Sequence, residues 1–323
     1  MQQRRFGRTG FDISAFTLGG GIVGGILISA PEDTRLEALQ RIVAAGCTWI
    51  DTAGDYGGGE SELALGRLLP EVTPHPRLST KFRLDMSRLD DLEGQVRRAI
   101  ETSLERLRLD RVEVFQLHNQ VSATPAAGMI SPHDVLRQDG VADIFDRLRE
   151  EGLFDAIGFT GLGDAAAIVE VLDSGRFDTV QVYFNMLNPS AGQAMPHGWS
   201  GQDFSGVLDA CKRHDVGTMA IRVLAAGVLA TDERHGREVI VTRDTDLDRE
   251  QARARLLFDR VGDAHGTRAQ TAIRYALTNP ALSTLVVGVA TLEQLDEALA
   301  AIEAGPLPDD ALAKVTAGHA QAD

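Results

Sequence analysis

The sequence predicts an α/β protein built as a (β/α)8 TIM barrel with an N-terminal β-hairpin. Short apolar runs alternate with amphipathic helical segments, and the strand–helix unit recurs eight times. Alternation of this kind predicts a parallel sheet, and eight units in one chain favour a closed barrel over an open sheet. No linker or change of composition divides the chain, so we expect one domain spanning residues 1–323.

The elements are expected in the following order. Residues 4–12 predict the hairpin, and residues 13–18 predict the first inner strand. Apolar runs predict further strands at residues 48–51, 77–81, 112–118, 154–159, 179–183, 218–221 and 283–287. Apolar residues at helical spacing predict helices at residues 33–45, 61–69, 89–107, 141–150, 165–172, 204–214, 249–261, 268–277 and 292–302. Long segments at 120–139, 187–199 and 231–248 follow strands, so we expect them at the face where a barrel builds its active site.

Composition excludes several classes of partner. The hydrophobic fraction of 43% and the charged fraction of 24% are those of a soluble globular protein. The net charge of −15, with no basic tract, argues against nucleic acid or an acidic membrane surface as a partner. Cys47 and Cys211 lie far apart in apolar runs, which predicts buried reduced thiols and a cytoplasmic location. The sequence shows no signal-peptide pattern and no apolar run of transmembrane length.

Ionisable side chains follow three successive predicted strands. Asp51, Lys81 and His118 each stand where an apolar run ends, and Tyr56 lies in the glycine-rich loop after the first of these runs. Each residue alone is a weak signal, because a strand-end lysine or histidine is more often a solvated or hydrogen-bonded loop residue. Together they bring a phenol, a cation, an anion and an imidazole into one barrel mouth.

This set is suited to carbonyl reduction. A free tyrosine has a pKa of about 10, too high for easy proton donation near neutral pH. A neighbouring ammonium stabilises the phenolate and is expected to lower that pKa, while Asp51 holds the ammonium of Lys81 in place. An imidazole at His118 would orient the carbonyl oxygen beside the phenol of Tyr56.

Residues 51–66, 79–81 and 115–118 resemble the aldo-keto reductases, and so do residues 6–10 and 18–20. The resemblance runs almost end to end. It implies a (β/α)8 barrel that uses a nicotinamide cofactor, NADP or NAD, without a Rossmann domain, and a small carbonyl or alcohol substrate (an aldehyde, ketone or sugar).

The same resemblance implies roles for the residues at the mouth. Tyr56 is the proton donor, Lys81 and Asp51 tune it, and His118 orients the carbonyl. On the cofactor side the implied residues are Gly20, Thr160, Gln181, Phe184, Arg222, Leu224, Gly227, Gly288 and Gln294. Among these, Thr160 and Gln181 correspond to groups that bond the carboxamide. Phe184 corresponds to an aromatic ring against the nicotinamide, with a core aromatic at a strand end as the alternative.

The cofactor segments depart from the family pattern in three places. Gly161 stands where an asparagine is usual, and Arg222 replaces a serine that precedes the pyrophosphate cradle. Many relatives carry Arg or Lys after the glycine near the last strand, gripping the 2′-phosphate of NADP, but Val289 and Ala290 supply no charge here. We therefore expect a weakened preference for NADP, with NAD as a usable cofactor.

Other interpretations remain open at this stage. The chain could be a nucleotide-binding module that senses redox state with little turnover. A Rossmann fold using the glycines of residues 19–24 is a third reading, but the helix does not open at the last glycine as that fingerprint requires. Trp199 and Met129 are candidate apolar walls of the substrate pocket, with Trp199 as an anchor that packs its loop on the barrel as the alternative. The histidines show no metal-ligand spacing, so we expect no metal. The conformation of the loops determines which substrate binds, and the sequence does not predict that conformation. The oligomeric state and the direction of the reaction also stay open.

Overall fold

The computed structural model describes residues 1–124, 126–243 and 245–319. Residue 125 of the predicted loop 120–139, residue 244 of the loop 231–248, and residues 320–323 of the predicted domain lie outside the described residues. Parallel strands form a closed barrel, which confirms the predicted fold class. In chain order these are β3 (Phe16–Gly19), β4 (Trp49–Asp51), β5 (Arg77–Phe82), β6 (Val112–Leu117), β9 (Phe154–Gly161), β10 (Thr179–Tyr183), β11 (Gly217–Ile221) and β12 (Thr284–Val287).

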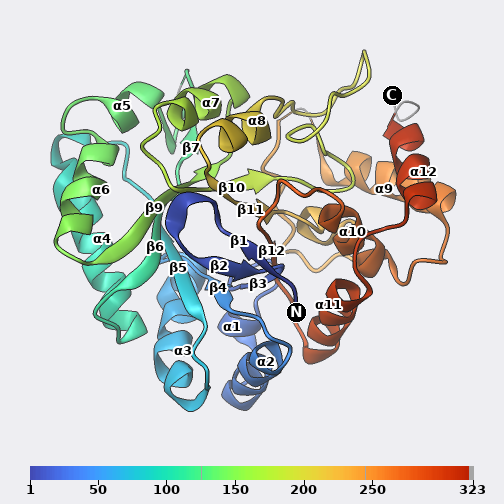
Figure 1. Cartoon of the computed structure of the whole chain (residues 1–323), viewed down its shortest axis with the longest axis horizontal. Helices are drawn as coiled ribbons and strands as arrows, with labels where there is room; N and C mark the ends of the chain where they lie inside the picture. Colours follow the sequence, from blue (N-terminus) through green and yellow to red (C-terminus); the bar gives the residue numbers. More distant parts are fainter. Residues whose placement is uncertain (125, 244, 320–323) are drawn as a thin grey trace.

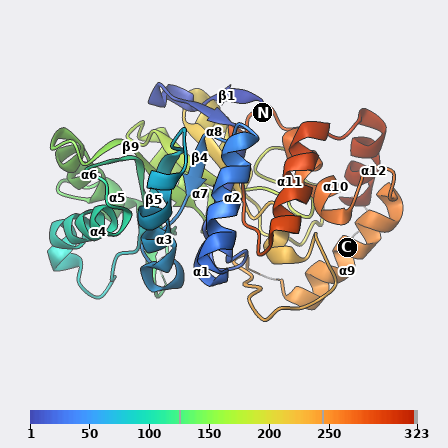
Figure 2. The same ribbon diagram turned by 90° about the horizontal axis from the view of Figure 1, so that it is seen from below.

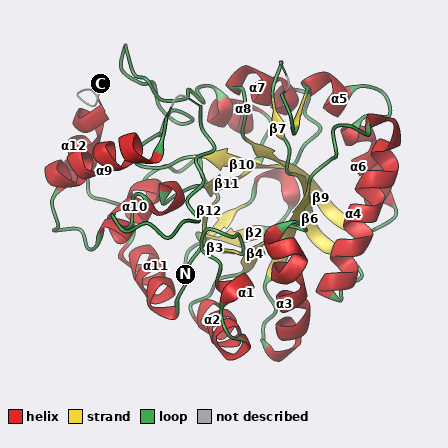
Figure 3. Cartoon of the chain, turned by 180° about the vertical axis from the view of Figure 1, so that it is seen from behind, coloured by secondary structure: helices red, strands yellow, loops and turns green. Residues whose placement is uncertain are grey.

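Helices surround the strands as an outer ring (Figure 3). They are α2 (Glu32–Ala44), α3 (Glu60–Leu68), α4 (Leu92–Leu107), α6 (Val141–Glu150), α7 (Ala165–Asp173), α8 (Val207–Arg213), α9 (Leu247–Val261), α10 (Arg268–Leu277), α11 (Leu292–Ala304) and α12 (Asp309–His319). Short elements lie inside predicted loops: α1 (Ile26–Ser29), β7 (Gln120–Val121), β8 (Met129–Ile130) and α5 (Pro132–Leu136). The helix α12 is not predicted from the sequence, because it buries small residues such as Ala311 and leaves only a weak apolar stripe.

The predicted first strand is divided in the structure. Its start belongs to β2 (Asp12–Ser14), which pairs antiparallel with β1 (Gln3–Arg5) as the N-terminal hairpin. The barrel strand β3 begins only at Phe16. The sequence does not show this break, because no glycine or proline marks a turn between Ile13 and Leu18.

The hairpin covers one end of the barrel, as two perpendicular views show (Figures 1 and 2). Phe6 and Ile13 are fully buried and pack against Trp49, Val114 and Met219 inside the strands. The rings of Phe6 and Trp49 meet edge to face with 5.3 Å between centroids, a favourable aromatic geometry. The N-terminal end of the barrel is therefore filled by apolar side chains, and the polar interior lies toward the other end.

Strand register assembles that polar interior. Asp51 of β4 is level with Ser79 of β5, and Lys81 is level with Gln116 of β6. Residues two apart on a strand point to the same face, so Ser79 and Lys81 both face inward. The barrel thus gathers charged and amide side chains near the C-terminal ends of its strands.

The state of the cysteines and the apolar length of the helices can also be compared with the sequence. Cys47 and Cys211 are buried free thiols. Within residues 1–124, 126–243 and 245–319, no helix combines the length and apolar character needed to cross a membrane.

Candidate active site

A cavity of about 690 Å³ opens at the C-terminal ends of the barrel strands. Its walls come from the loops after β3, β4, β11 and β12 and from the start of α11. Ten residues singled out from the sequence line it: Asp51, Tyr56, His118, Thr160, Gln181, Arg222, Leu224, Gly227, Gly288 and Gln294. The strand ends therefore bring the predicted catalytic and cofactor groups into one space.

A buried ion pair lies beneath the cavity. Lys81 is fully buried, and its Nζ donates to Asp51 Oδ2 at 2.6 Å and to the Thr52 carbonyl oxygen at 2.7 Å. Burial alone would lower the pKa of Lys81, but the neighbouring Asp51 carboxylate and Tyr56 phenol outweigh it and raise that pKa. Lys81 is thus an ammonium ion held in place by Asp51.

Tyr56 lies directly above this pair. It starts a tight turn, Tyr56–Gly59, in which Gly57 and Gly58 have φ values of 63° and 67° that favour glycine. The Lys81 Nζ is 4.8 Å from the centre of the phenol ring. Burial raises the pKa of Tyr56, and the ammonium of Lys81 opposes that rise without reversing it. The lowered pKa expected from the sequence is therefore wrong for the protein alone, since desolvation of the phenolate exceeds the attraction of the cation. The phenol stays protonated at neutral pH, as a proton donor must.

His118 faces Tyr56 from the end of β6. The two rings meet edge to face with 5.7 Å between centroids, and the His118 backbone N–H donates to the Phe82 carbonyl oxygen at 2.8 Å. Burial, with the nearby cations of Lys81 and Arg83, lowers the pKa of His118 to about 4, although Asp55 opposes the shift. The Nδ1 atom lies 3.6 Å from Asp55 Oδ1, beyond hydrogen-bond range. His118 is thus a neutral imidazole at pH 7.

Sequence reasoning missed two charged residues beside His118, namely Arg83 and Asp55. Arg83, two residues after Lys81, donates from Nε to Asp55 Oδ2 at 2.9 Å and from Nη1 to the His118 carbonyl oxygen at 3.1 Å. Arg83 also lines the cavity. Its position just past the end of β5 is the signal that could have identified it, because residues there face the barrel mouth.

The loop after β11 turns sharply at the cavity wall. Arg222, Ala225, Ala226 and Gly227 have positive φ values of 61°, 47°, 58° and 101°. The backbone N–H groups of Ala225 and Gly227 donate to the carbonyl oxygens of Arg222 and Leu224 at 2.8 Å each, so these hydrogen bonds stabilise the turn. The Arg222 guanidinium donates to the Val239 carbonyl oxygen at 2.7 Å, and burial lowers the pKa of Arg222. Arg222 therefore places a cation at the cavity wall.

The opposite wall is formed by close backbone packing. A Cβ atom on Gly24 would lie 2.4 Å from the Val289 backbone nitrogen, so the loop after β3 rests directly on the end of β12. Beyond it, Thr291 caps α11, and the Gln294 side chain accepts a hydrogen bond from the Ala290 backbone N–H at 2.8 Å. A helix N-terminus at this point offers backbone donors to a phosphate or ribose.

A cation that sequence reasoning missed reaches this end of the cavity from the predicted loop 231–248. Arg237, in the segment after β11, approaches the Gly24 carbonyl oxygen at 3.5 Å. It lines the main cavity and an adjoining cavity of about 430 Å³ that also touches Ala290, Thr291 and Glu293. Within the described part of the chain Arg237 forms no ion pair. No motif marks this residue, because the loop crosses the cavity only in three dimensions.

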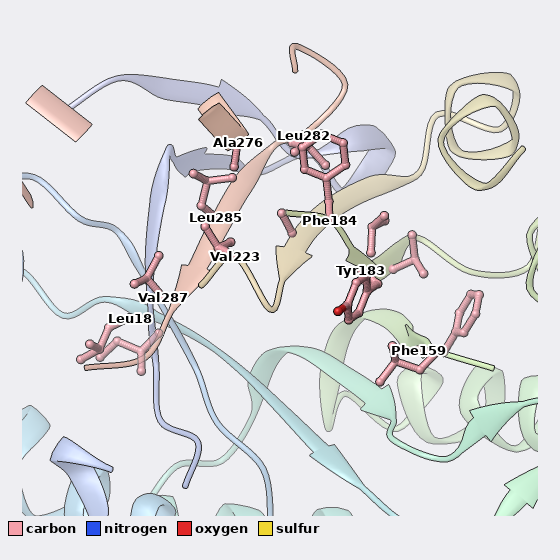
Figure 4. Close-up of a cluster of buried hydrophobic side chains, with 14 of the residues drawn as sticks. Leu18, Phe159, Tyr183, Phe184, Val223, Ala276, Leu282, Leu285 and Val287 are labelled. Carbon is pink, nitrogen blue, oxygen red and sulfur yellow. The ribbon is translucent and has the colours of Figure 1, made fainter. Parts of the chain in front are cut away.

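The structure places Phe184 and Gly20 outside the cavity wall. Phe184 is 3% exposed and stacks on Tyr275, with 6.0 Å between ring centres, inside an apolar cluster (Figure 4). The Phe184 ring points into this cluster and not into the cavity. At the end of the adjacent strand β11, Ile221 lines the cavity. Gly20 allows close packing: a Cβ there would lie 2.5 Å from Ser61 Oγ.

The two proposed substrate walls are also not brought to the cavity. The Trp199 ring lies over the Arg253 guanidinium at 6.0 Å, which anchors its loop on α9. The Met129 sulfur contacts Arg243 Nη2 at 3.8 Å. Neither residue is among those that line the cavity. Loop residues of this kind pack wherever the loop folds back, which spacing in the sequence does not specify. Within the described part of the chain, no group of three or more His, Cys, Asp or Glu side chains is arranged to hold a metal ion.

The chain is similar to known enzymes in sequence and in fold. The chain is 25% identical to L-galactose dehydrogenase of Arabidopsis thaliana, covering 94% of this chain and 88% of that protein. It is 28% identical to D-threo-aldose 1-dehydrogenase of a Pseudomonas species, over 71% of each. Its fold matches an aldo-keto reductase of Bacillus halodurans solved in its holo form, with a TM-score of 0.75 and 19% identity, covering 100% of this chain and 97% of that one.

The family model "Aldo/keto reductase family" matches residues 16–319, which include every strand of the barrel and every residue of the cavity wall. The chain therefore belongs to the aldo/keto reductase family and is an oxidoreductase that acts on carbonyl or alcohol groups.

Proposed function

We propose that this enzyme interconverts a carbonyl and an alcohol, with NAD or NADP in the 690 Å³ cavity and Tyr56 as the residue that moves the proton. The observation that carries the proposal is the position of the Tyr56 phenol. It lies above the Lys81 ammonium and beside the His118 ring, in the wall of that cavity. No other tyrosine lines the cavity within the described part of the chain.

Each side chain has a distinct task in this scheme. A nicotinamide bound in the cavity would supply or accept the hydride. Tyr56 gives its proton to the substrate oxygen in reduction and takes one in oxidation, by microscopic reversibility. The Lys81 ammonium stabilises the phenolate left behind, and Asp51 fixes that ammonium. Neutral His118 can donate an N–H to the same oxygen and so hold the carbonyl in line.

The cavity wall fits the parts of a dinucleotide. Gln181 and Thr160 present amide and hydroxyl groups beside Asp51, where a carboxamide would bind. Arg222 and the loop at Gly227 suit the pyrophosphate, and Gln294 suits the adenosine. Val289 and Ala290 give the adenosine end no cation, which supports the use of NAD.

Arg237 is the residue on which any remaining preference for NADPH should depend. Changing Arg237→Gln is expected to weaken NADPH binding while leaving NADH binding nearly unchanged, because only NADPH carries a 2′-phosphate for the guanidinium to meet. In the unaltered enzyme the NADPH preference in kcat/KM should stay below about a hundredfold, or about 2.7 kcal/mol. Dissociation constants for both dinucleotides, measured by calorimetry, check this.

The matched control is Arg243→Gln, a change in the same loop at an arginine that pairs with Asp164 at 2.9 Å. It should not alter the ratio of the two affinities. A hundredfold NADPH preference that survives in Arg237→Gln would contradict this account of cofactor choice.

We further propose a small hydroxylated substrate such as a sugar. Arg83 and Gln120 line the cavity on the side of His118 and offer hydrogen bonds to hydroxyl groups. Two relatives bear the names of sugar dehydrogenases, L-galactose dehydrogenase and D-threo-aldose 1-dehydrogenase, which supports this class.

Steady-state assays test the proposal. The enzyme should oxidise aldoses with NAD or reduce aldehydes with NADH, and it should prefer aldoses to an apolar aldehyde such as 4-nitrobenzaldehyde. Tight dinucleotide binding without turnover on either set would instead favour a redox-sensing module. Turnover of the apolar aldehyde alone would remove the sugar class and keep the reaction.

A further inference from the structure

The carboxylate of Asp51 is the meeting point of side chains from several strands. Its Oδ2 atom accepts from Lys81 Nζ at 2.6 Å. Its Oδ1 atom accepts from Ser79 Oγ at 2.7 Å, Gln181 Nε2 at 2.9 Å and Gln116 Nε2 at 3.3 Å. All of these side chains are at least nine-tenths buried. The two oxygens thus have separate partners: one holds the cation, and the other collects neutral donors.

The neutral donors satisfy the Asp51 oxygen that does not bind Lys81. Hydrogen bonds of this kind offset the cost of burying a carboxylate. Ser79 is itself fixed, since its Oγ accepts from the indole N–H of Trp49 at 3.2 Å. The Asp51 carboxylate partly cancels the electrostatic effect of the Lys81 ammonium on Tyr56. When the neutral donors bind Asp51 more strongly, this cancellation is smaller.

Gln181 differs from Gln116 in one respect. Both donate to the same oxygen of Asp51, but Gln181 lines the cavity and Gln116 does not. With Nε2 directed to Asp51, the other end of the Gln181 amide, Oε1, stands 3.5 Å from Thr160 Oγ1 at the cavity wall. Gln181 is therefore a bridge with one end in the proton-transfer unit and the other at the nicotinamide end of the cavity.

We propose that Gln181 couples occupancy of the cavity to the Asp51–Lys81 pair: a carboxamide N–H donated to Gln181 Oε1 strengthens the bond from Gln181 Nε2 to Asp51 Oδ1. Hydrogen bonds in such a chain polarise one another. Binding of the dinucleotide then draws charge from Asp51, leaves the Lys81 ammonium freer to stabilise a phenolate, and makes Tyr56 more acidic. Gln181 is a positioning residue in this role. The inference rests on the proposed function, because it takes the ligand to be a nicotinamide dinucleotide.

The ionisable groups that face Tyr56 are Asp51 from β4, Asp55 from the loop after β4, Lys81 from β5, His118 from the end of β6 and Arg222 from the end of β11. Of these, only Asp51 accepts a hydrogen bond from Gln181. A change at Gln181 therefore reaches Tyr56 through Asp51, while the other four groups stay as they are.

The test is a spectrophotometric titration of the Tyr56 phenolate, with and without saturating NADH. The sequence has three tyrosines, and a Tyr56→Phe variant identifies the signal of Tyr56. We compare the unaltered enzyme with Gln181→Met and with the matched control Gln116→Met. The nicotinamide ring of NADH is uncharged, so the ring itself does not shift the Tyr56 pKa by direct charge–charge interaction.

In the unaltered enzyme, NADH should lower the Tyr56 pKa by about one unit, the size of shift that one nearby charge or strong hydrogen bond produces. Without NADH, both variants should show a higher Tyr56 pKa, because each loses a donor to Asp51. With NADH, Gln116→Met should keep the downward shift and Gln181→Met should lose it.

An equal shift in Gln181→Met and in the unaltered enzyme would overturn the coupling, and so would loss of the shift in Gln116→Met. Calorimetric measurement of NADH binding distinguishes failure of the coupling from failure of the proposed function. A bound dinucleotide that leaves the Tyr56 pKa unchanged overturns the coupling alone, whereas a protein that binds neither NADH nor NADPH overturns the proposed function and the coupling with it.

Discussion

Replacing Tyr56 by phenylalanine is expected to lower kcat by about 10²–10⁴-fold, the range that general acid–base catalysis supplies. The variant keeps the ring between Lys81 and His118 and removes only the hydroxyl that gives up the proton. Dinucleotide affinity should survive, because the pyrophosphate loop at Arg222 and the adenosine end at Gln294 are unchanged. Steady-state rates and dinucleotide dissociation constants measured together check both parts.

Tyr275→Phe is the matched control. Tyr275 is buried in α10 against Phe184 and lies outside the cavity wall, so this change should leave kcat close to that of the unaltered enzyme. Undiminished turnover in Tyr56→Phe would mean that another group or water supplies the proton.

Replacing Lys81 by methionine is expected to destabilise the fold by about 3–5 kcal/mol, because it leaves the buried Asp51 carboxylate without its cation. The double variant Asp51→Asn, Lys81→Met should recover much of that loss, since neither charge then remains. Unfolding in denaturant measures the free energies. Both variants should also lose activity, because the field that stabilises the Tyr56 phenolate is gone.

A surface ion pair offers the comparison. Arg97 and Glu151 meet at 2.6 Å, but their side chains are 35% and 46% exposed. Arg97→Met should change the free energy of unfolding by only about 0–1 kcal/mol. A Lys81→Met variant no less stable than Arg97→Met would show that the Asp51 carboxylate is not held as a buried anion.

The fold could be predicted because its signals are periodic. Strands such as residues 179–183 and helices such as residues 141–150 and 268–277 have the same bounds in the structure as in the sequence analysis. The errors fall where periodicity is absent. No glycine or proline marks the break at Ala15, and α12 packs through small residues that make no strong stripe.

The candidate site could be predicted at the strand ends and at the loop positions that match the family's motifs, such as Tyr56 and Gln294. Asp51, Lys81 and His118 are fixed by the barrel, since the C-terminal ends of its strands share one face. Trp199 and Met129 could not be placed, because loops fold back by contacts far away in the sequence. Arg237 was missed for the same reason. The direction of the Tyr56 pKa shift could not be predicted from the sequence. Burial raises this pKa and the Lys81 charge lowers it, and which effect is larger depends on how deeply the phenol is buried.

The pH dependence of kcat/KM for carbonyl reduction, measured at saturating NADH, tests most directly whether Tyr56 is the proton donor, since this ratio reports the ionisations of the enzyme form that meets the carbonyl. Burial raises the Tyr56 pKa above its ordinary value, and the His118 pKa is about 4. The account predicts a level profile between about pH 6 and 8, with a fall only at alkaline pH, where Tyr56 loses its proton. A fall as pH rises through about 6 to 7, the ordinary range of histidine, would contradict it and identify an imidazolium as the donor.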